Sequence, residues 1–108
     1  MPMQPLKNLT ESMFYVLMAL CRCPMCGIDI AAFIEKRTEE RLKIGPATLY
    51  TILAKFEKEH YIREIKVDGR KRTYQITKTG LNAYEEELNR LRYCVADALH
   101  EKRDSFEQ

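Results

Sequence analysis

The sequence predicts a mainly α-helical fold that carries one small β-hairpin and ends in a long helix. Three patterns lead to this expectation. Residues 10–61 contain three segments with apolar side chains at helical spacing, and residues 63–77 change to alternating spacing. After residue 77, apolar side chains repeat with heptad spacing. A chain of 108 residues is enough for one domain and leaves no room for a separate catalytic domain.

The first expected helix follows Thr10, a residue type that caps helix N-termini, and has Glu11 in its first turn. Residues 13–20 are apolar on nearly every face, which is typical of a helix buried on more than one side. The longest apolar run, residues 13–21, is too short to span a bilayer. We therefore expect a cytoplasmic protein with no membrane partner.

Two further helices are expected before the hairpin. A connector over residues 22–26 leads to a helix that starts at Gly27 and buries Ile30, Phe33 and Ile34. A third helix starts at Pro46, where the missing N–H has no cost. Its apolar stripe consists of Leu49, Ile52, Leu53 and Phe56. Its opposite face carries small, polar or basic residues, namely Ala47, Thr48, Thr51, Ala54, Lys55 and Lys58.

Residues 63–77 (REIKVDGRKRTYQIT) alternate in polarity around Asp68-Gly69, which predicts a hairpin. A two-residue turn would place Ile65 opposite Arg72. A four-residue tip, residues 68–71, places Ile65 opposite Tyr74 and gives better apolar pairing, so we favour it. In either register Arg70 and Lys71 lie at or beside the apex.

Thr77 can cap the final helix, whose apolar residues repeat at intervals of three and four: Leu81, Tyr84, Leu88, Leu91, Val95 and Ala98. Packing this helix on the first helix of a second chain would bury both apolar surfaces in a two-fold dimer. The alternative is that the helix folds back on its own chain. We favour the homodimer, with an interface formed by Phe14, Leu17, Met18, Tyr84, Leu88, Leu91 and Val95.

Three helices followed by a two-stranded hairpin is the order of a winged helix-turn-helix, in which the third helix enters the DNA major groove. The hairpin, called the wing, contacts the flanking DNA backbone. We therefore expect residues 1–77 to form a winged helix-turn-helix domain with its wing at residues 63–77. Residues 78–108 are expected to form a C-terminal dimerisation helix and a charged tail.

Residues 43–78 carry nine basic and four acidic side chains, although the net charge of the whole chain is only +2. Such a local basic region indicates double-stranded DNA as a partner, with an ordinary solvated face as the alternative. Small residues on the third helix permit close approach to the groove. Thr48 and Thr51 can donate to phosphates or bases, and lysines add charge. The expected DNA-binding residues are Ala47, Thr48, Thr51, Lys55 and Lys58 on the helix, and Arg70, Lys71 and Arg72 on the wing.

Four segments of the chain match a known family: LTESMFYVLMAL at 9–20, ATLYTILAKFEKEHYI at 47–62, YQITKTG at 74–80 and RLRYCVADAL at 90–99. On these segments the chain resembles the PadR family of bacterial and archaeal transcriptional regulators, from about Leu9 to Leu99. The last segment fits the short subgroup. The resemblance implies a homodimeric repressor on an inverted-repeat operator, often released by a small hydrophobic or aromatic effector. It also implies that Tyr50 contacts the DNA backbone beside Thr48, with Arg70 and Arg72 acting from the wing.

Two departures from the family pattern concern ligand binding. A family segment of the type G-P-M-H-G-Y is replaced here by CPMCGID at 23–29, so that Cys23, Cys26 and Ile28 stand at the glycine, histidine and tyrosine positions. The chain also has no tryptophan for effector stacking. A ligand cavity in the dimer interface could be bordered by the faces near Phe14, Met18, Tyr84, Leu88 and Leu91. We favour the other interpretation, in which these residues form the packed core of the interface.

The spacing of Cys21, Cys23 and Cys26 suggests either a zinc site or redox-active thiols. A structural zinc site normally needs four ligands, and Cys94 is far along the chain, so no metal and no cofactor are expected. We expect Cys21 to be buried, and Cys23 and Cys26 to be exposed candidates for a thiol switch, although plain structural cysteines are favoured.

No set of nucleophile, base and acid appears, so no catalytic residue is assigned and an enzyme is not expected. The carboxylates at 85–87 are expected to face solvent. Two alternatives to a DNA-binding regulator remain open: a winged-helix module that binds a partner protein, and a redox-responsive regulator based on the cysteines.

Overall fold

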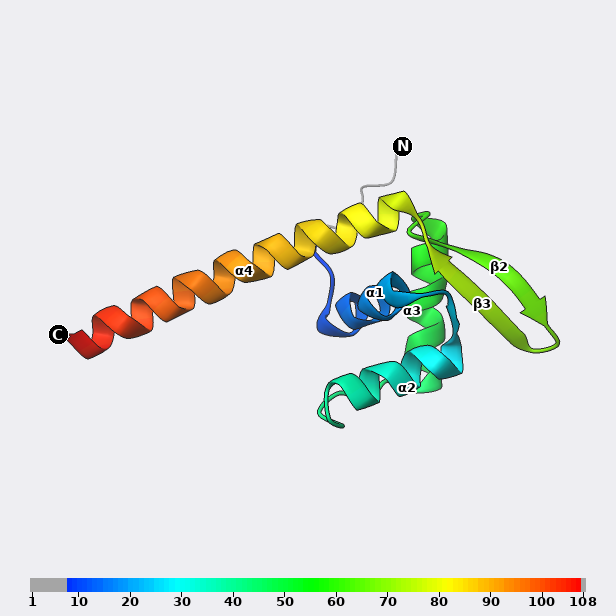
Figure 1. The fold of residues 1–108 in the computed structure, drawn as a ribbon, viewed down its shortest axis with the longest axis horizontal. Coiled ribbons are helices and arrows are strands. Elements are labelled where there is room, and N and C mark those ends of the chain that lie inside the picture. The colour runs from blue at the N-terminus through cyan, green and yellow to red at the C-terminus, as the bar shows by residue number, and fades with distance from the viewer. Residues whose placement is uncertain (1–7, 108) are drawn as a thin grey trace.

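The computed structural model describes the backbone of residues 8–107 and the side chains of residues 8–103. The described elements are α1 (Glu11–Arg22), β1 (Met25–Cys26), α2 (Gly27–Arg37), α3 (Pro46–Lys58), β2 (Ile62–Asp68), β3 (Lys71–Ile76) and α4 (Lys78–Glu107). The predicted mainly α-helical fold with a small hairpin and a long final helix is confirmed (Figure 1). The expected domain limits at residues 1 and 108 lie outside the described residues.

Helices α1, α2 and α3 surround one apolar core. The six largest fully buried side chains come two from each helix: Val16 and Leu17, Ile30 and Ile34, and Leu53 and Phe56. Two predicted helix starts are confirmed. Thr10 caps α1, because its Oγ1 accepts a hydrogen bond of 3.1 Å from the Met13 amide. Pro46 is the first residue of α3, as expected. Helical spacing of apolar residues therefore predicted the core correctly.

The three strands form an antiparallel sheet in the order β1-β3-β2. Strand β1 was not expected, because two residues are too few to show an alternating pattern. It pairs Met25 with Tyr74 and Cys26 with Thr73, and so joins the connector before α2 to the wing.

In the hairpin, Lys66 pairs with Thr73 and Val67 with Arg72, which is the register of the longer tip. The four-residue tip itself is wrong, because Asp68 also pairs with Lys71 and the turn consists of Gly69 and Arg70 alone. The predicted pairing of Ile65 with Tyr74 is wrong, since a β-bulge between Glu64 and Lys66 places Glu64 opposite Tyr74. The bulge adds one residue to β2 and leaves Ile65 46% exposed. Gly69, at the tip, has a φ of +63°, a conformation that glycine adopts without steric cost.

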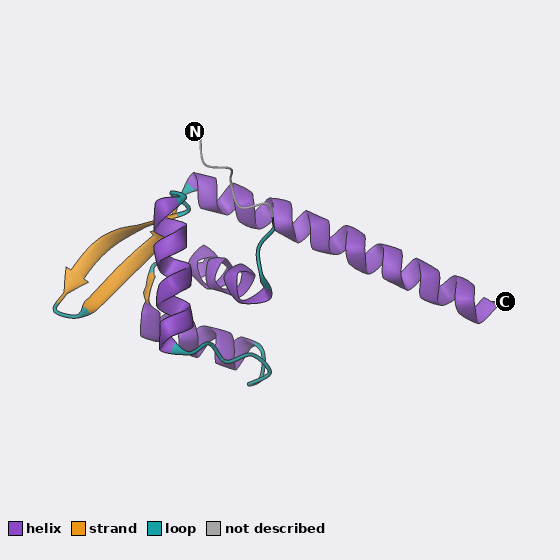
Figure 2. Ribbon diagram, turned by 180° about the vertical axis from the view of Figure 1, so that it is seen from behind, coloured by secondary structure: helices purple, strands orange, loops and turns teal. Residues whose placement is uncertain are grey.

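Thr77 caps the start of helix α4, because its hydroxyl accepts a hydrogen bond from the Gly80 amide (3.0 Å) and donates one to the His60 carbonyl (2.6 Å). A Cβ at Gly80 would collide with the Tyr61 carbonyl, so this close approach needs glycine. From there α4 runs past α1 and projects beyond the other elements (Figures 1 and 2). The long axis of the molecule is 62 Å as a result.

The first part of α4 packs on α1 of the same chain, as the fold-back alternative describes. Leu17 is fully buried within its own chain and Phe14 is 9% exposed, so neither offers much surface to a partner. For Leu17 the expected place in a dimer interface is therefore corrected to the monomer core. Met18, Tyr84, Leu88 and Leu91 are half-buried against this core, whereas Val95 is 57% exposed.

Glu87 corrects a second expectation, because its side chain is buried rather than solvent-facing. Its carboxylate accepts hydrogen bonds from Arg90 Nε (2.8 Å) and Nη2 (2.6 Å), and from the backbone of Leu9. The Arg90 hydrogen bonds lower the pKa of Glu87 despite the opposing effect of burial. Arg90 itself is exposed and lies on α4 like Glu87, so it is the contact of Glu87 with Leu9 that joins the segment before α1 to α4.

None of the helices in the described part of the chain has both the length and the apolar character that a membrane-spanning helix needs.

Candidate nucleic-acid interface

The outer face of α3 has the composition expected of a surface that approaches DNA closely. Every residue predicted for this face is exposed, while the apolar stripe on the opposite side is buried. The Thr51 hydroxyl donates to the Ala47 carbonyl at 2.9 Å, so its proton is used within the helix and its oxygen remains as an acceptor. Thr48, by contrast, makes no hydrogen bond through its side chain to the described residues and can donate or accept.

Three of the five basic residues of the wing, Arg70, Lys71 and Arg72, lie at or next to its tip, and all three are exposed. Arg72 is partly neutralised, because its Nη1 lies 3.5 Å from Glu64 Oε2. Arg70 and Lys71 form no ion pair with any residue in the described part of the chain. These two side chains are therefore the cations at the wing tip without an ion-pair partner among the described residues, and Arg63 and Lys66, further along β2, have no ion-pair partner there either.

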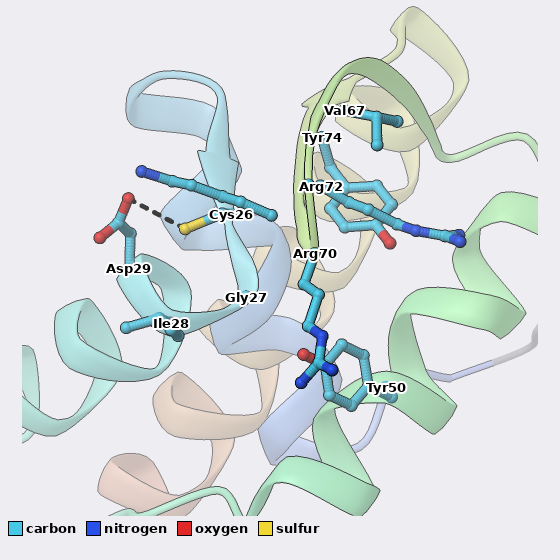
Figure 3. A pocket seen from close by; sticks show the side chains of 11 residues that line it. Cys26, Gly27, Ile28, Asp29, Tyr50, Val67, Arg70, Arg72 and Tyr74 are labelled. Atoms are coloured by element: carbon cyan, nitrogen blue, oxygen red, sulfur yellow. Dashed lines mark hydrogen bonds between the residues drawn. The ribbon is translucent and has the colours of Figure 1, made fainter.

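A cavity of about 710 Å³ separates the wing from α3 and from the start of α2. We call it the wing cavity, and it is lined by residues 26–29, 50, 67, 69–72 and 74. Tyr50 of α3 and Arg70 of the wing both border it, and Figure 3 shows Arg70 extending towards Tyr50. Tyr50 of α3 and the cationic tip of the wing thus border one hollow, which none of the outer-face residues of α3 lines.

A second cavity of about 390 Å³ lies on the other flank of α3. Thr48 and Lys55 border it from α3, and Thr10 and Ser12 border it from the start of α1. Ala47 and Thr51 of the outer face line it as well, so the outer face borders this second cavity, whereas Tyr50 borders the wing cavity. An α-helix with its side chains is about 10–12 Å across, close to the width of the major groove, so α3 matches that groove in size.

Sequence reasoning missed two contributors to this surface, namely the start of α1 and the start of α2. Ile28 in particular is 79% exposed and lines the wing cavity. The sequence does contain a sign of this role, because Ile28 is apolar although it lies off the apolar stripe of its helix. The signal could not be interpreted without knowing that β1 brings this turn beside the wing.

The cysteines differ from expectation in two places. Cys21 is exposed rather than buried, and partial burial of its thiol, followed by the charge of Glu85, raises its pKa. Cys26 is buried rather than exposed, and its thiol donates to Asp29 Oδ2 at 3.2 Å. Cys23 is exposed, as expected. Residues 8–103 contain no group of three or more side chains of the metal-ligating types placed to hold a metal ion.

Comparison with known proteins agrees with this architecture. A transcriptional regulator from Clostridium thermocellum superposes with a TM-score of 0.71 and 26% identity, covering 84% of this chain and 87% of that one. Bacillus subtilis PadR in complex with operator DNA superposes with a TM-score of 0.62 and 20% identity, covering 70% of this chain and 46% of that chain.

A Streptomyces fradiae transposon encodes an uncharacterized 37.1 kDa protein that is 34% identical over 79 residues, or 73% of this chain. The chain spans 22% of the length of that relative. Residues 16–86 match the model of the transcriptional regulator PadR-like family, which is well over half of the chain. Together with the winged-helix fold described above, this match places the chain in the PadR-like family of transcriptional regulators.

Proposed function

We propose that this chain is a sequence-specific, double-stranded DNA-binding transcriptional regulator that acts in the cytoplasm as a homodimeric repressor on an inverted-repeat operator. The observation that carries the proposal is the wing cavity, where Tyr50 of α3 and the wing cations Arg70 and Lys71 border one hollow. The likeness to a PadR protein in complex with operator DNA supports it by analogy of fold.

In this proposal α3 enters the major groove, where Ala47 and Ala54 allow close approach. The Thr51 oxygen, with its proton committed to Ala47, accepts from a base amino group such as adenine N6 or cytosine N4. Thr48 and Tyr50 contact the sugar-phosphate backbone, and Lys55 and Lys58 add electrostatic attraction. Arg70, Lys71 and Arg72 contact phosphates or a narrow minor groove from the wing.

The dimer is proposed to form through the projecting part of α4. The heptad pattern continues through Val95 and Ala98, and both residues are exposed in the single chain. A second copy of the chain would cover this surface, with Met18, Tyr84, Leu88 and Leu91 at its edge. Two recognition helices related by a two-fold axis would read half-sites about one helical turn, ~34 Å, apart.

The decisive experiment is selection of bound fragments from a random duplex library. The proposal expects enrichment of an inverted repeat whose half-sites are about one turn apart. Binding of every fragment with equal affinity, or of none, would reject it. A failure to bind any DNA would favour the alternative of a winged-helix module that recognises a partner protein.

A further inference from the structure

The second cavity beside α3, about 390 Å³ in volume, joins the outer face of this helix to the start of α1. We call it the hydroxyl cavity, because four of its eight lining residues carry a hydroxyl group: Thr10, Ser12, Thr48 and Thr51. The proposed function assigns a role to the α3 side of this cavity and none to the α1 side. The start of α1 therefore lies next to the proposed DNA surface without an assigned part in it.

The hydroxyl groups of the cavity are mostly available as hydrogen-bond donors. Thr10 Oγ1 accepts the amide hydrogen bond that caps α1, but its own proton is not donated to any described residue. The side chains of Ser12, which is half-buried, and Thr48, which is exposed, make no hydrogen bond within the part of the chain that the structure describes. Among the four, only Thr51 commits its proton, to a backbone carbonyl of its own helix.

The charge of the hydroxyl cavity is positive. Lys55 is the one charged residue among those that line it, and it forms no ion pair with any described residue. Glu11, the acidic residue in the first turn of α1, is outside the lining, and its Oε2 lies 3.4 Å from Arg41 Nη1. The wing cavity differs in this respect, because Asp29 lines it. The hydroxyl cavity thus combines donors and a cation without an opposing carboxylate.

A phosphodiester group matches this lining better than a base does. Its oxygens carry negative charge and only accept hydrogen bonds, whereas base edges in the major groove present donors as well as acceptors. A helix in the major groove also has a sugar-phosphate strand on each side, because the two strands form the edges of the groove. Tyr50 and the wing border one flank of α3, and the hydroxyl cavity lies on the other flank.

We infer that the hydroxyl cavity binds a phosphate of the DNA backbone, with Ser12 of α1 as a hydrogen-bond donor. Thr48 and Lys55 complete the site from α3. The inference rests on the proposed function, because it requires α3 to lie in the major groove. It adds α1 to the DNA interface, so that each flank of α3 holds one strand and the depth of the helix in the groove is fixed from both sides.

Removal of the donor is the first test. Ser12→Ala should weaken binding to the selected operator and to an unrelated duplex by the same factor, about fivefold, because a phosphate contact carries no sequence information. Asn89, which is exposed on α4 and outside the cavity, is the control position, and Asn89→Ala should leave both affinities unchanged. Fluorescence anisotropy with labelled duplexes measures these affinities. A loss confined to the operator would identify Ser12 as a base contact and overturn the phosphate site.

Addition of a cation is the second test. Ser12→Lys should bind DNA more tightly than wild type, and the log–log dependence of affinity on salt should become steeper by about 0.9, since one more phosphate is neutralised. Asn89→Lys changes the net charge equally and should leave the slope as it is in wild type. Equal slopes in the two lysine variants would show that the start of α1 does not approach the backbone, and would overturn the inference.

Neutral methylphosphonate groups, placed one at a time in the operator, identify the phosphate. At one position in each half-site, the substitution should weaken wild type by more than it weakens Ser12→Ala, because both changes remove the same contact. Additive losses at every position, with DNA binding otherwise intact, would overturn the inference and leave the proposed function standing. A wild-type chain that binds no duplex at all would reject both, so the two failures are distinguishable.

Discussion

The rings of Phe14 and Tyr84 stack with their centroids 4.8 Å apart and their planes 12° from parallel, which joins α1 to α4 within one chain. The contact orients the part of α4 that ends near Leu91 along the domain. The rest of the helix then has no surface of its own chain to cover it. The contact that folds the first part of α4 back on its own chain therefore leaves the projecting part of the helix exposed, and we propose that a second copy covers it.

Truncation of this stack should destabilise the domain. Tyr84→Ala is expected to lower the free energy of unfolding by about 2 kcal/mol, since it removes a half-buried aromatic side chain and its stacking energy. Urea denaturation followed by circular dichroism measures the change. Tyr50→Ala is the matched control, because Tyr50 is 59% exposed and should change stability by less than about 0.5 kcal/mol. Equal losses would show that the stack is not the cause.

Introducing a charge at Val95 should abolish the dimer. Val95 lies in the heptad seam, so Val95→Glu would bury an unpaired carboxylate at the proposed interface. Sedimentation at micromolar concentration should find this variant monomeric. Its neighbour Ala96 is exposed on the other side of the helix, and Ala96→Glu should remain dimeric. If both variants stay dimeric, the seam does not form the interface.

Removal of the Glu64 carboxylate should strengthen DNA binding. Glu64 lies 3.5 Å from Arg72, so Glu64→Gln frees a cation that can then contact phosphate. The log–log dependence of affinity on salt should become steeper by up to about 0.9, and Arg70→Gln should make it shallower by about 0.9. Fluorescence anisotropy between 50 and 200 mM salt measures both slopes. Glu101→Gln, on the far part of α4, controls for net charge and should leave the slope unchanged.

Replacement of Thr51 should change sequence preference more than overall affinity. Because the Thr51 proton is donated to Ala47, Thr51→Val removes an acceptor and should relax one base position by about 1–3 kcal/mol. Thr51→Ser keeps the acceptor and should keep the preference. Selected-library sequencing of the variants compares them. A uniform loss of affinity on all sequences would identify Thr51 as a backbone contact.

The buried Glu87 should make the domain sensitive to acid. Its pKa is lower in the folded chain than when unfolded, so the carboxylate stabilises the fold above its unfolded pKa, and this stability is lost as the pH falls through the folded pKa. Glu87→Gln should cost about 1–3 kcal/mol at pH 7 and flatten the acid dependence. Urea titrations at several pH values measure this, with the exposed neighbour Glu86→Gln as control. An unchanged acid dependence in Glu87→Gln would contradict the role of this carboxylate.

What the sequence alone determined is the set of local elements. Three features follow from residues that are close together in the chain. They are the start of each of the first three helices, the cations at the hairpin tip, and the apolar stripe of α3, which consists of Leu49, Ile52, Leu53 and Phe56. Spacing and capping residues act within a few positions, so they can be interpreted without a fold.

The tertiary structure alone decided how distant segments meet. Three features depend on residues that are far apart in the sequence: the pairing of β1 with β3, the bulge that exposes Ile65, and the burial of Glu87 against Leu9. The same is true of Ile28, which lines the wing cavity only because β1 carries the start of α2 beside the wing. Local periodicity contains no information about such contacts, because their energy exists only once the chain has folded.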